Sequence, residues 1–373
     1  MPLSLPVSPA LSAELFSSRM PRTRVSIPGF VDLQVNGHRG VDFSSAELAA
    51  SAFGRACDEL LSLGTAAFLP TVITSPRATY ERNLPLIGAA IAGNEFRGRL
   101  LGIHLEGPFI SPEPGAVGAH APQWVRPPDT GLLDSLVEWS AGTVRLLTVA
   151  PERPGALDLI AHAVRAGVVV SIGHTLATES VIAEAAAAGA TAFTHLGNGM
   201  PNVVPRHANP MWGALAEERL TAMIITDGHH LPPAVIKSVL RAKGVERSIV
   251  VSDASPMAGM PPGRYEASGN RIVLEPDGKL HNPEKGCLVG SSATMLACMN
   301  HIASLGLLSL QELLAVGFHN PLALIGVAPS EVRDGGAVWY DSDKRMFVVT
   351  ADRGGRTSPV RRGPARRKHG GPR

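Results

Sequence analysis

The sequence predicts a (β/α)8 barrel, and three observations lead to this fold class. Eight short β-branched or apolar runs recur along the chain. Longer stretches rich in Ala and Leu, with helical spacing, lie between them, and such alternation is typical of a parallel sheet. Polar residues capable of chemistry follow the ends of these runs, and in a barrel all strand ends meet at one face.

The predicted strands and helices alternate in strict order. The strands are residues 29–34, 65–71, 100–105, 144–149, 168–172, 190–194, 221–226 and 248–252. We expect crossover helices at residues 45–63, 77–92, 157–166, 178–188 and 232–243. An open, doubly wound sheet would scatter the polar residues along an edge, and no G-x-G-x-x-G motif opens a helix after the first strand, so the closed barrel is favoured.

The sequence after the eighth strand predicts smaller elements. Residues 263–280 carry the turn segments Ser268-Gly269-Asn270 and Pro276-Asp277-Gly278, which indicate a hairpin. Helices are expected at 292–304 and 310–317, and residues 336–350 alternate like short strands. We therefore divide the chain into a poorly patterned N-terminal segment or remnant accessory sheet at 1–27, a barrel at 28–328, accessory strands at 329–350 and a disordered basic tail at 351–373.

Composition and charge exclude several protein classes. The 373-residue chain is 45% hydrophobic and 18% charged, which suffices for a large core. Residues from 351 onward carry seven arginines and one lysine against one aspartate, so the net charge of +2 divides into +7 on the tail and about −5 elsewhere. A nucleic-acid-binding protein would carry basic charge on its folded surface, so no such partner is expected. No membrane-length apolar run and no disulfide spacing of cysteines occur, so we expect a cytoplasmic protein.

Three residues that follow different predicted strands form a candidate metal site. Glu106, His174 and His195 would point into the same barrel mouth. A carboxylate with two imidazoles is a catalytic zinc set that leaves one position for water, whose pKa such a metal lowers to about 7. Ferrous iron accepts the same ligands, so we expect one divalent ion per subunit, with zinc as the first choice and iron as the alternative.

Asp253 ends the last predicted strand, within Val250-Val251-Ser252-Asp253-Ala254. At that position its carboxylate would lie near the metal-bound water. It could take a proton from the water and return it to a leaving amine, acting first as a base and then as an acid. By itself such an aspartate would be interpreted as a helix N-cap or a turn residue, so this prediction depends on the metal site.

Nine segments stand in the order seen in N-acetylglucosamine-6-phosphate deacetylases of the amidohydrolase superfamily, and the chain resembles that family from about residue 28 to residue 326. They are specific as a set, although no single one would identify the family. The segments are Pro28-Gly29-Phe30-Val31-Asp32, His104-Leu105-Glu106-Gly107-Pro108-Phe109, Gly118-Ala119-His120, Thr148-Val149-Ala150-Pro151-Glu152, Gly173-His174-Thr175, Thr194-His195-Leu196-x-Asn198, Asp227-Gly228-His229-His230, Ser252-Asp253-Ala254 and Gly290-Ser291-Ser292.

The resemblance implies roles for individual residues. Glu106, His174 and His195 resemble the family's metal ligands and Asp253 its acid/base, while His120 would polarise the acetyl carbonyl. Arg206, eleven residues after His195, matches the phosphate arginine, and His230 resembles the sugar-phosphate histidine. The remaining positions resemble pocket residues that meet the substrate or form the wall: Ala119, Asn198, Gly199, Leu288, Val289 and Gly290.

The chain also departs from its relatives at informative positions. Many amidohydrolases have His-x-His after the first strand for a second metal, whereas this chain has Gln34-Val35-Asn36. Amides are poor transition-metal ligands, so one metal is expected. Gly197 and Gly199 replace residues that are usually larger in the family, and two residues are inserted between Glu106 and His120.

The resemblance implies hydrolysis of the acetamide of N-acetylglucosamine 6-phosphate to glucosamine 6-phosphate and acetate, a step of amino-sugar catabolism. It also implies a homodimer. An amidohydrolase acting on another N-acetylated amino-sugar phosphate or on a cyclic amide is the alternative. A non-catalytic sugar-phosphate-binding protein is a third interpretation, against which the full set of metal ligands and Asp253 argues.

Overall fold

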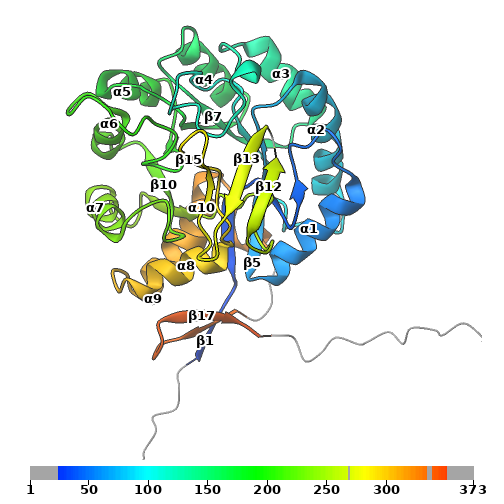
Figure 1. Cartoon of the computed structure of the whole chain (residues 1–373), viewed down its shortest axis with the longest axis vertical. Helices are drawn as coiled ribbons and strands as arrows, with labels where there is room; N and C mark the ends of the chain where they lie inside the picture. Colours follow the sequence, from blue (N-terminus) through cyan, green and yellow to red (C-terminus); the bar gives the residue numbers. More distant parts are fainter. Residues whose placement is uncertain (1–23, 268, 334–337, 351–373) are drawn as a thin grey trace, which may run out of the picture.

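The computed structural model describes residues 24–267, 269–333 and 338–350, and its centre is an eight-stranded parallel barrel (Figure 1). Neighbouring strands follow the chain order, and Asn36 N donates to Ala254 O at 2.7 Å where the last strand meets the first. The predicted fold class is therefore confirmed. The barrel strands are β2 (Phe30–Val35), β5 (Thr65–Ile73), β6 (Ile103–Glu106), β7 (Val144–Val149), β8 (Val169–Ile172), β9 (Ala192–Phe193), β10 (Thr221–Ile225) and β11 (Ser248–Val251).

Amphipathic helices surround the barrel and connect its strands. They are α1 (Ala50–Ser62), α2 (Arg77–Ala92), α3 (Thr130–Trp139), α4 (Ala156–Arg165), α5 (Glu179–Ala187), α6 (Pro210–Ala216), α7 (Pro233–Lys243) and α8 (Met295–Ser304). The ranges predicted for the helices did not include α3 and α6. Their starts are nonetheless capped by side chains, because Asp129 accepts from Leu132 N and Asn209 accepts from Met211 N.

The barrel interior is apolar at one end and polar at the other. Side chains of the barrel strands, among them Leu33, Leu69 and Met223, form a buried cluster with Phe318 and Leu322. These last two belong to a C-terminal group of short helices that packs against this apolar end: α9 (Leu310–Leu314), the π-helix η2 (Ala315–His319) and α10 (Asn320–Leu324). The short helices η1 (Pro122–Trp124) and η3 (Pro329–Glu331) lie in connections.

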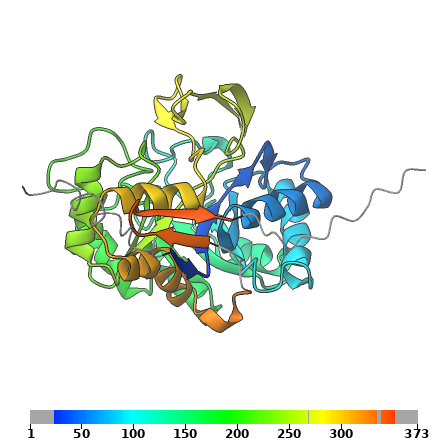
Figure 2. The same cartoon turned by 90° about the horizontal axis from the view of Figure 1, so that it is seen from below.

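A three-stranded antiparallel sheet joins the two ends of the described chain (Figure 2). It contains β1 (Arg24–Ile27), β16 (Val338–Asp341) and β17 (Met346–Val349), in the order β1-β16-β17. The sheet packs on the barrel through Phe347, whose ring meets Phe30 edge-on at 4.9 Å between centroids. Short strands were predicted in residues 336–350 and are found there. The predicted disordered tail and most of the N-terminal segment lie outside the described residues.

A second small sheet stands over the barrel mouth (Figures 1 and 2). The predicted hairpin is the first half of this four-stranded antiparallel sheet, and we call residues 263–288 the β insert. Its strands are β12 (Gly263–Ala267), β13 (Asn270–Leu274), β14 (Leu280–Asn282) and β15 (Cys287–Leu288). Two further short strands, β3 (Gly37–His38) and β4 (Val41–Asp42), pair at the rim. In the described part of the chain, no helix is long and apolar enough to cross a membrane.

Candidate active site

Glu106, His174 and His195 converge at the polar end of the barrel. Glu106 Oε1 lies 3.1 Å from His174 Nε2 and 2.9 Å from His195 Nε2, and the two imidazole nitrogens are 3.0 Å apart. All three side chains are buried. The three atoms therefore form one compact set of ligand atoms from three different strand ends, which is the grouping that the sequence predicted.

The facing ligand atoms of this triad do not carry enough protons to hydrogen-bond with one another. A bound metal ion would accept their lone pairs instead. His174 Nδ1 lies 2.7 Å from the Ala116 carbonyl oxygen, which can only accept, so Nδ1 carries the proton and Nε2 presents a lone pair. That lone pair faces a carboxylate oxygen and a second imidazole nitrogen. Tetrahedral zinc with ligand bonds of about 2.0–2.1 Å would place ligand atoms about 3.3 Å apart. The residues present therefore fit a bound divalent cation.

Electrostatics at the triad also favour a cation. Burial alone would raise the pKa of Glu106, but the imidazoles of His174 and His195, which contact its carboxylate, hold the pKa well below its ordinary value. The Glu106 carboxylate is therefore ionised over the physiological range. A buried anion with imidazoles around it is a favourable setting for a divalent ion.

Backbone strain is concentrated at the strand ends of this site. His174 has φ of 49°, His195 has φ of 31° and Asp253 has φ of 50°, all in the left-handed region that residues other than glycine rarely adopt. Such conformations cost about 1–3 kcal/mol each and are typical of functional sites. They turn three side chains from the strand direction into the barrel mouth.

Gly199 packs against both histidine ligands. Its φ is +60°, and a Cβ added there would lie 3.0 Å from His174 Nδ1 and 3.0 Å from His195 Cε1. A larger residue would displace these rings. The glycine is therefore required here by the close approach of the loop to the triad.

Two amide side chains hold Asp253 by a single oxygen. Gln34 Nε2 donates to Asp253 Oδ1 at 3.0 Å and Asn36 Nδ2 donates to the same atom at 2.7 Å, while Gln34 also donates to Glu106 Oε1 at 2.8 Å. Burial and the Glu106 charge raise the pKa of Asp253 to about 8, against the lowering effects of His195 and Asn36. Asp253 Oδ2 remains available to exchange a proton on the cavity side.

His120 lies beside the triad as a neutral imidazole. Its ring meets His174 at 4.3 Å between centroids, and its Nε2 is 3.9 Å from Glu106 Oε2. Burial and the neighbouring His174 lower the pKa of His120 to about 3, although Glu106 opposes this effect. A neutral ring carries one N–H, which can be donated to a carbonyl oxygen in the cavity.

His230 is oriented by Asp227 on the far side of the cavity from His120. His230 Nδ1 lies 2.8 Å from Asp227 Oδ2, and Ser291 Oγ donates to that same oxygen at 3.0 Å. Burial alone would raise the pKa of Asp227, but hydrogen bonds from His230 hold it well below its ordinary value. The carboxylate accepts the Nδ1 proton, so His230 Nε2 is available to a ligand.

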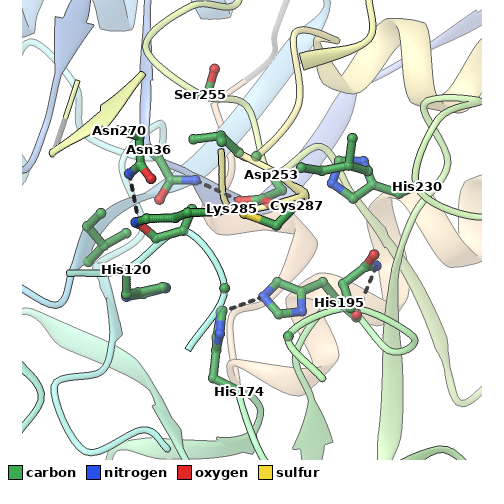
Figure 3. Close-up of a pocket in the computed structure, with 18 of the residues that line it drawn as sticks. Asn36, His120, His174, His195, His230, Asp253, Ser255, Asn270, Lys285 and Cys287 are labelled. Carbon is green, nitrogen blue, oxygen red and sulfur yellow. Dashed lines mark hydrogen bonds between the residues drawn. The ribbon is translucent and has the colours of Figure 1, made fainter. Parts of the chain in front are cut away.

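These residues surround one cavity of about 370 Å³ (Figure 3), a size suited to a small ligand. All but one of the residues predicted from the sequence line it. They are Glu106, Ala119, His120, His174, His195, Asn198, Gly199, His230, Asp253, Leu288, Val289 and Gly290. Arg206 is the exception, since it lies on an exposed loop outside the lining, where its carbonyl accepts from Trp212 Nε1. Its role in phosphate binding stays a prediction.

Sequence reasoning did not assign roles to several residues of the β insert that line the cavity. Asn270 and Lys285 are among them (Figure 3). Of the described residues that line the cavity, Lys285 is the one with a lysine or arginine side chain. A turn motif was the only sequence signal near Asn270, and none marked Lys285. The insert folds over the mouth, and this placement became visible only in three dimensions.

A barrel whose strand ends hold a buried Glu-His-His set, a tethered aspartate and a neutral histidine defines an amidohydrolase-type enzyme. The N-acetylglucosamine-6-phosphate deacetylase of Danio rerio is 33% identical to this chain, over 87% of this chain and 80% of that protein. The N-acetylgalactosamine-6-phosphate deacetylase of Escherichia coli O157:H7 is 30% identical, over 88% and 83% respectively. The chain belongs to the N-acetylglucosamine-6-phosphate deacetylase family.

A solved structure supports the same relationship. An aspartate-to-alanine mutant of N-acetyl-D-glucosamine-6-phosphate deacetylase from Mycobacterium smegmatis, in complex with N-acetyl-D-glucosamine 6-phosphate, matches with a TM-score of 0.78 at 30% identity. The match covers 88% of this chain and 87% of that chain. No protein-family model matches the sequence.

Proposed function

We propose that this protein hydrolyses the acetamide of N-acetylglucosamine 6-phosphate, releasing acetate and glucosamine 6-phosphate. The observation that carries the proposal is the convergence of Glu106, His174 and His195 with Asp253 in one buried cavity. Deacetylases of this family cover most of the chain at about one-third identity, 33% in Danio rerio, which supports the same activity.

The metal would be a single divalent ion held by Glu106, His174 and His195. When bound, such an ion supplies Lewis acidity and lowers the pKa of water. Zinc suits two imidazoles and a carboxylate, and ferrous iron is the alternative. Gln34 and Asn36 use their amide N–H groups on carboxylates, so they serve as hydrogen-bond donors and not as ligands for a second ion.

The chain's own residues then provide the proton transfers. Asp253 Oδ2 accepts a proton from the attacking water while a C–O bond forms at the acetyl carbon. His120 donates its N–H to the carbonyl oxygen as negative charge develops there. Asp253 next gives the proton to the nitrogen as the C–N bond breaks, so the amine leaves neutral together with acetic acid, which then releases a proton to become acetate.

The sugar phosphate would extend from the triad toward His230 and the loop at Asn198 and Gly199. His230 Nε2 is free to meet the substrate because Asp227 holds the opposite ring nitrogen. Arg206 is exposed and flanked in its loop by Val203, which is 89% exposed, and Trp212, which is 54% exposed. We infer a homodimer in which this loop faces a second copy and brings Arg206 to the phosphate. Localisation in the cytoplasm also stays a prediction.

N-acetylgalactosamine 6-phosphate is the second candidate substrate. One relative at 30% identity carries that activity in its name, and it covers the chain as fully as the other relatives. The two sugars differ only in the configuration of one hydroxyl group. The acetamide and the phosphate would therefore meet the same residues.

The test is acetate release from both phosphorylated sugars and from N-acetylglucosamine without phosphate, together with the bound metal content. We expect phosphate-dependent turnover that a chelator abolishes and zinc or iron restores. Tightly bound metal with none of the three sugars hydrolysed would refute the proposed substrate class. The ratio of the two phosphorylated sugars decides which one the pocket prefers.

A further inference from the structure

Asn270 joins the β insert to the loop that carries His120. It is the first residue of β13 and is 2% exposed. Its Nδ2 donates to the carbonyl oxygen of Ala119 at 2.8 Å, a contact between positions 151 residues apart in the chain (Figure 3). Ala119 directly precedes His120, so this bond acts on the backbone of the histidine that faces the cavity.

A second buried amide orients Asn270. Asn282, which is 1% exposed, donates its Nδ2 to Asn270 Oδ1 at 3.1 Å. Its own Oδ1 accepts from the backbone N–H groups of Glu284 at 3.0 Å and Lys285 at 3.1 Å. Because backbone N–H groups only donate and the Ala119 carbonyl only accepts, both amides are fixed in direction, and a continuous path of hydrogen bonds runs from the β14–β15 turn to Ala119.

The His120 ring itself has little to hold it. Among the described residues, its buried Nδ1 has no hydrogen-bond partner, and the distance of 3.9 Å from Nε2 to Glu106 Oε2 is too long for a hydrogen bond. The ring is held by its edge-on packing against His174 and by its backbone, whose N–H donates to Val117 O at 3.1 Å. A displacement of about 1 Å at such a group can cost on the order of 100-fold in rate.

We propose that Asn270 is a positioning residue for His120, with Asn282 fixing its amide, so that the β insert sets the place of the group that polarises the acyl carbonyl. This inference rests on the proposed function, in which His120 donates to that carbonyl. It gives the insert a specific part in the reaction: His120 is aligned only when β13 is docked against the loop at residues 115–120.

The first experiment compares Asn270→Leu with Asn300→Leu. Leucine keeps the branching of the Asn270 side chain but removes both its donor and its acceptor. Asn300 is the matched control because it makes the same kind of bond, with Nδ2 donating to Phe347 O at 3.0 Å and Oδ1 accepting from Phe347 N at 2.7 Å, and it lies outside the cavity lining. We expect Asn270→Leu to lower kcat at least about tenfold with little change in KM or bound metal. Asn300→Leu should leave kcat unchanged.

A double mutant tests whether Asn270 acts through His120. If it does, adding Asn270→Leu to His120→Asn lowers kcat no further, because the aligned group is already absent. Full additivity of the two losses would overturn the proposal, and so would wild-type kcat in Asn270→Leu.

Hydrogen exchange separates this inference from the proposed function. In the holoenzyme, Asn270→Leu should speed amide exchange in residues 115–120, whereas Asn300→Leu should not. This readout needs no turnover. A wild-type protein that hydrolyses none of the sugars refutes the proposed function, while unchanged exchange in residues 115–120 refutes the positioning role of Asn270.

Discussion

The side-chain amide of Asn36 donates a hydrogen bond to Asp253 Oδ1 at 2.7 Å, and this bond links the end of the first barrel strand to the end of the last. Gln34 adds a second donor to the same oxygen at 3.0 Å. Two donors on Oδ1 stop the carboxylate from rotating and leave Oδ2 on the cavity side. The amide residues that stand where many amidohydrolases have His-x-His therefore orient the proton carrier.

Replacing Asn36 with Leu should impair Asp253 without removing the metal. The Asn36 hydrogen bond lowers the pKa of Asp253, so its loss makes the carboxylate harder to ionise. We expect a lower kcat and an acidic limb of the pH–rate profile that moves to higher pH by about one unit. The profile should be measured with metal content matched to the wild type. A limb at unchanged pH would argue against this role of Asn36.

Asp253→Asn should abolish most turnover while the metal and the fold remain. The amide has nearly the shape of the carboxylate but cannot take up the proton, so kcat should fall by about 100-fold to 10,000-fold, the usual contribution of a general base. Acetate release, metal analysis and circular dichroism provide the three measurements. Full activity in this variant would remove Asp253 from the mechanism.

Gly199→Ala should weaken metal binding. The new methyl group would lie 3.0 Å from atoms of both His174 and His195, so the rings must move. We expect metal affinity to fall about tenfold or more in a chelator competition. Gly142→Ala is the control, because Gly142 has a similar φ of +75° with nothing within 4 Å of the added carbon. Equal losses in the two variants would mean that backbone strain alone is responsible.

Most of the barrel was predictable from the sequence because each strand is a short apolar run followed by a polar residue. The match is close for β7 and α2, whose predicted and observed limits coincide. It is poorest for β9, which is only two residues long in the structure, and for the unpredicted α6, a seven-residue helix that begins with Pro210. Elements this short carry too little periodicity for a pattern to define them.

The site was predictable where chemistry is confined to strand ends. Glu106, His174 and His195 each lie at or just after the end of a strand, and the barrel geometry alone brings them together. Asn270 could not be found in this way, because its importance comes from the docking of the insert on a loop 151 residues away in the chain. Arg206 is the opposite case. A motif match located it in the sequence, but in the structure it does not line the cavity of the same chain.

Asp32 should make the protein less stable as pH rises from about 4 to 6. Burial raises the pKa of this carboxyl to about 6, against hydrogen bonds from Ser252 and Gln34, and its side chain is 1% exposed. Between the ordinary pKa and the raised one, the folded state binds more protons than the unfolded state, so the free energy of unfolding falls as pH rises, by up to about 3 kcal/mol.

Asp32→Asn isolates this effect. Asparagine can still accept hydrogen bonds from the backbone N–H groups of Gln34 and Ser252. The Ser252 hydroxyl already lies 3.4 Å from Gln34 O in the wild type, and in the variant it turns toward that oxygen. We expect the difference in unfolding free energy, wild type minus variant, to decline between pH 4 and pH 6 in denaturant titrations. Parallel curves over that interval would contradict the assignment.

Lys285 should determine how strongly the cavity prefers a phosphorylated sugar. It is the one lysine or arginine lining the cavity among the described residues, and its charge contributes to the lowered pKa of the buried His120. Loss of this cation weakens attraction for a dianion but not for a neutral sugar. We expect Lys285→Met to raise KM for N-acetylglucosamine 6-phosphate about tenfold and to leave KM for N-acetylglucosamine unchanged.

Two further variants make this test specific. Lys285→Arg keeps the charge and should retain most of the preference. Lys279→Met removes a lysine of the same β insert that lies outside the cavity lining, so KM for both sugars should stay at wild-type values. If Lys285→Met changed KM equally for both sugars, its effect would come from a disturbed insert, and Arg206 from the second copy would meet the charge of the phosphate without help from Lys285.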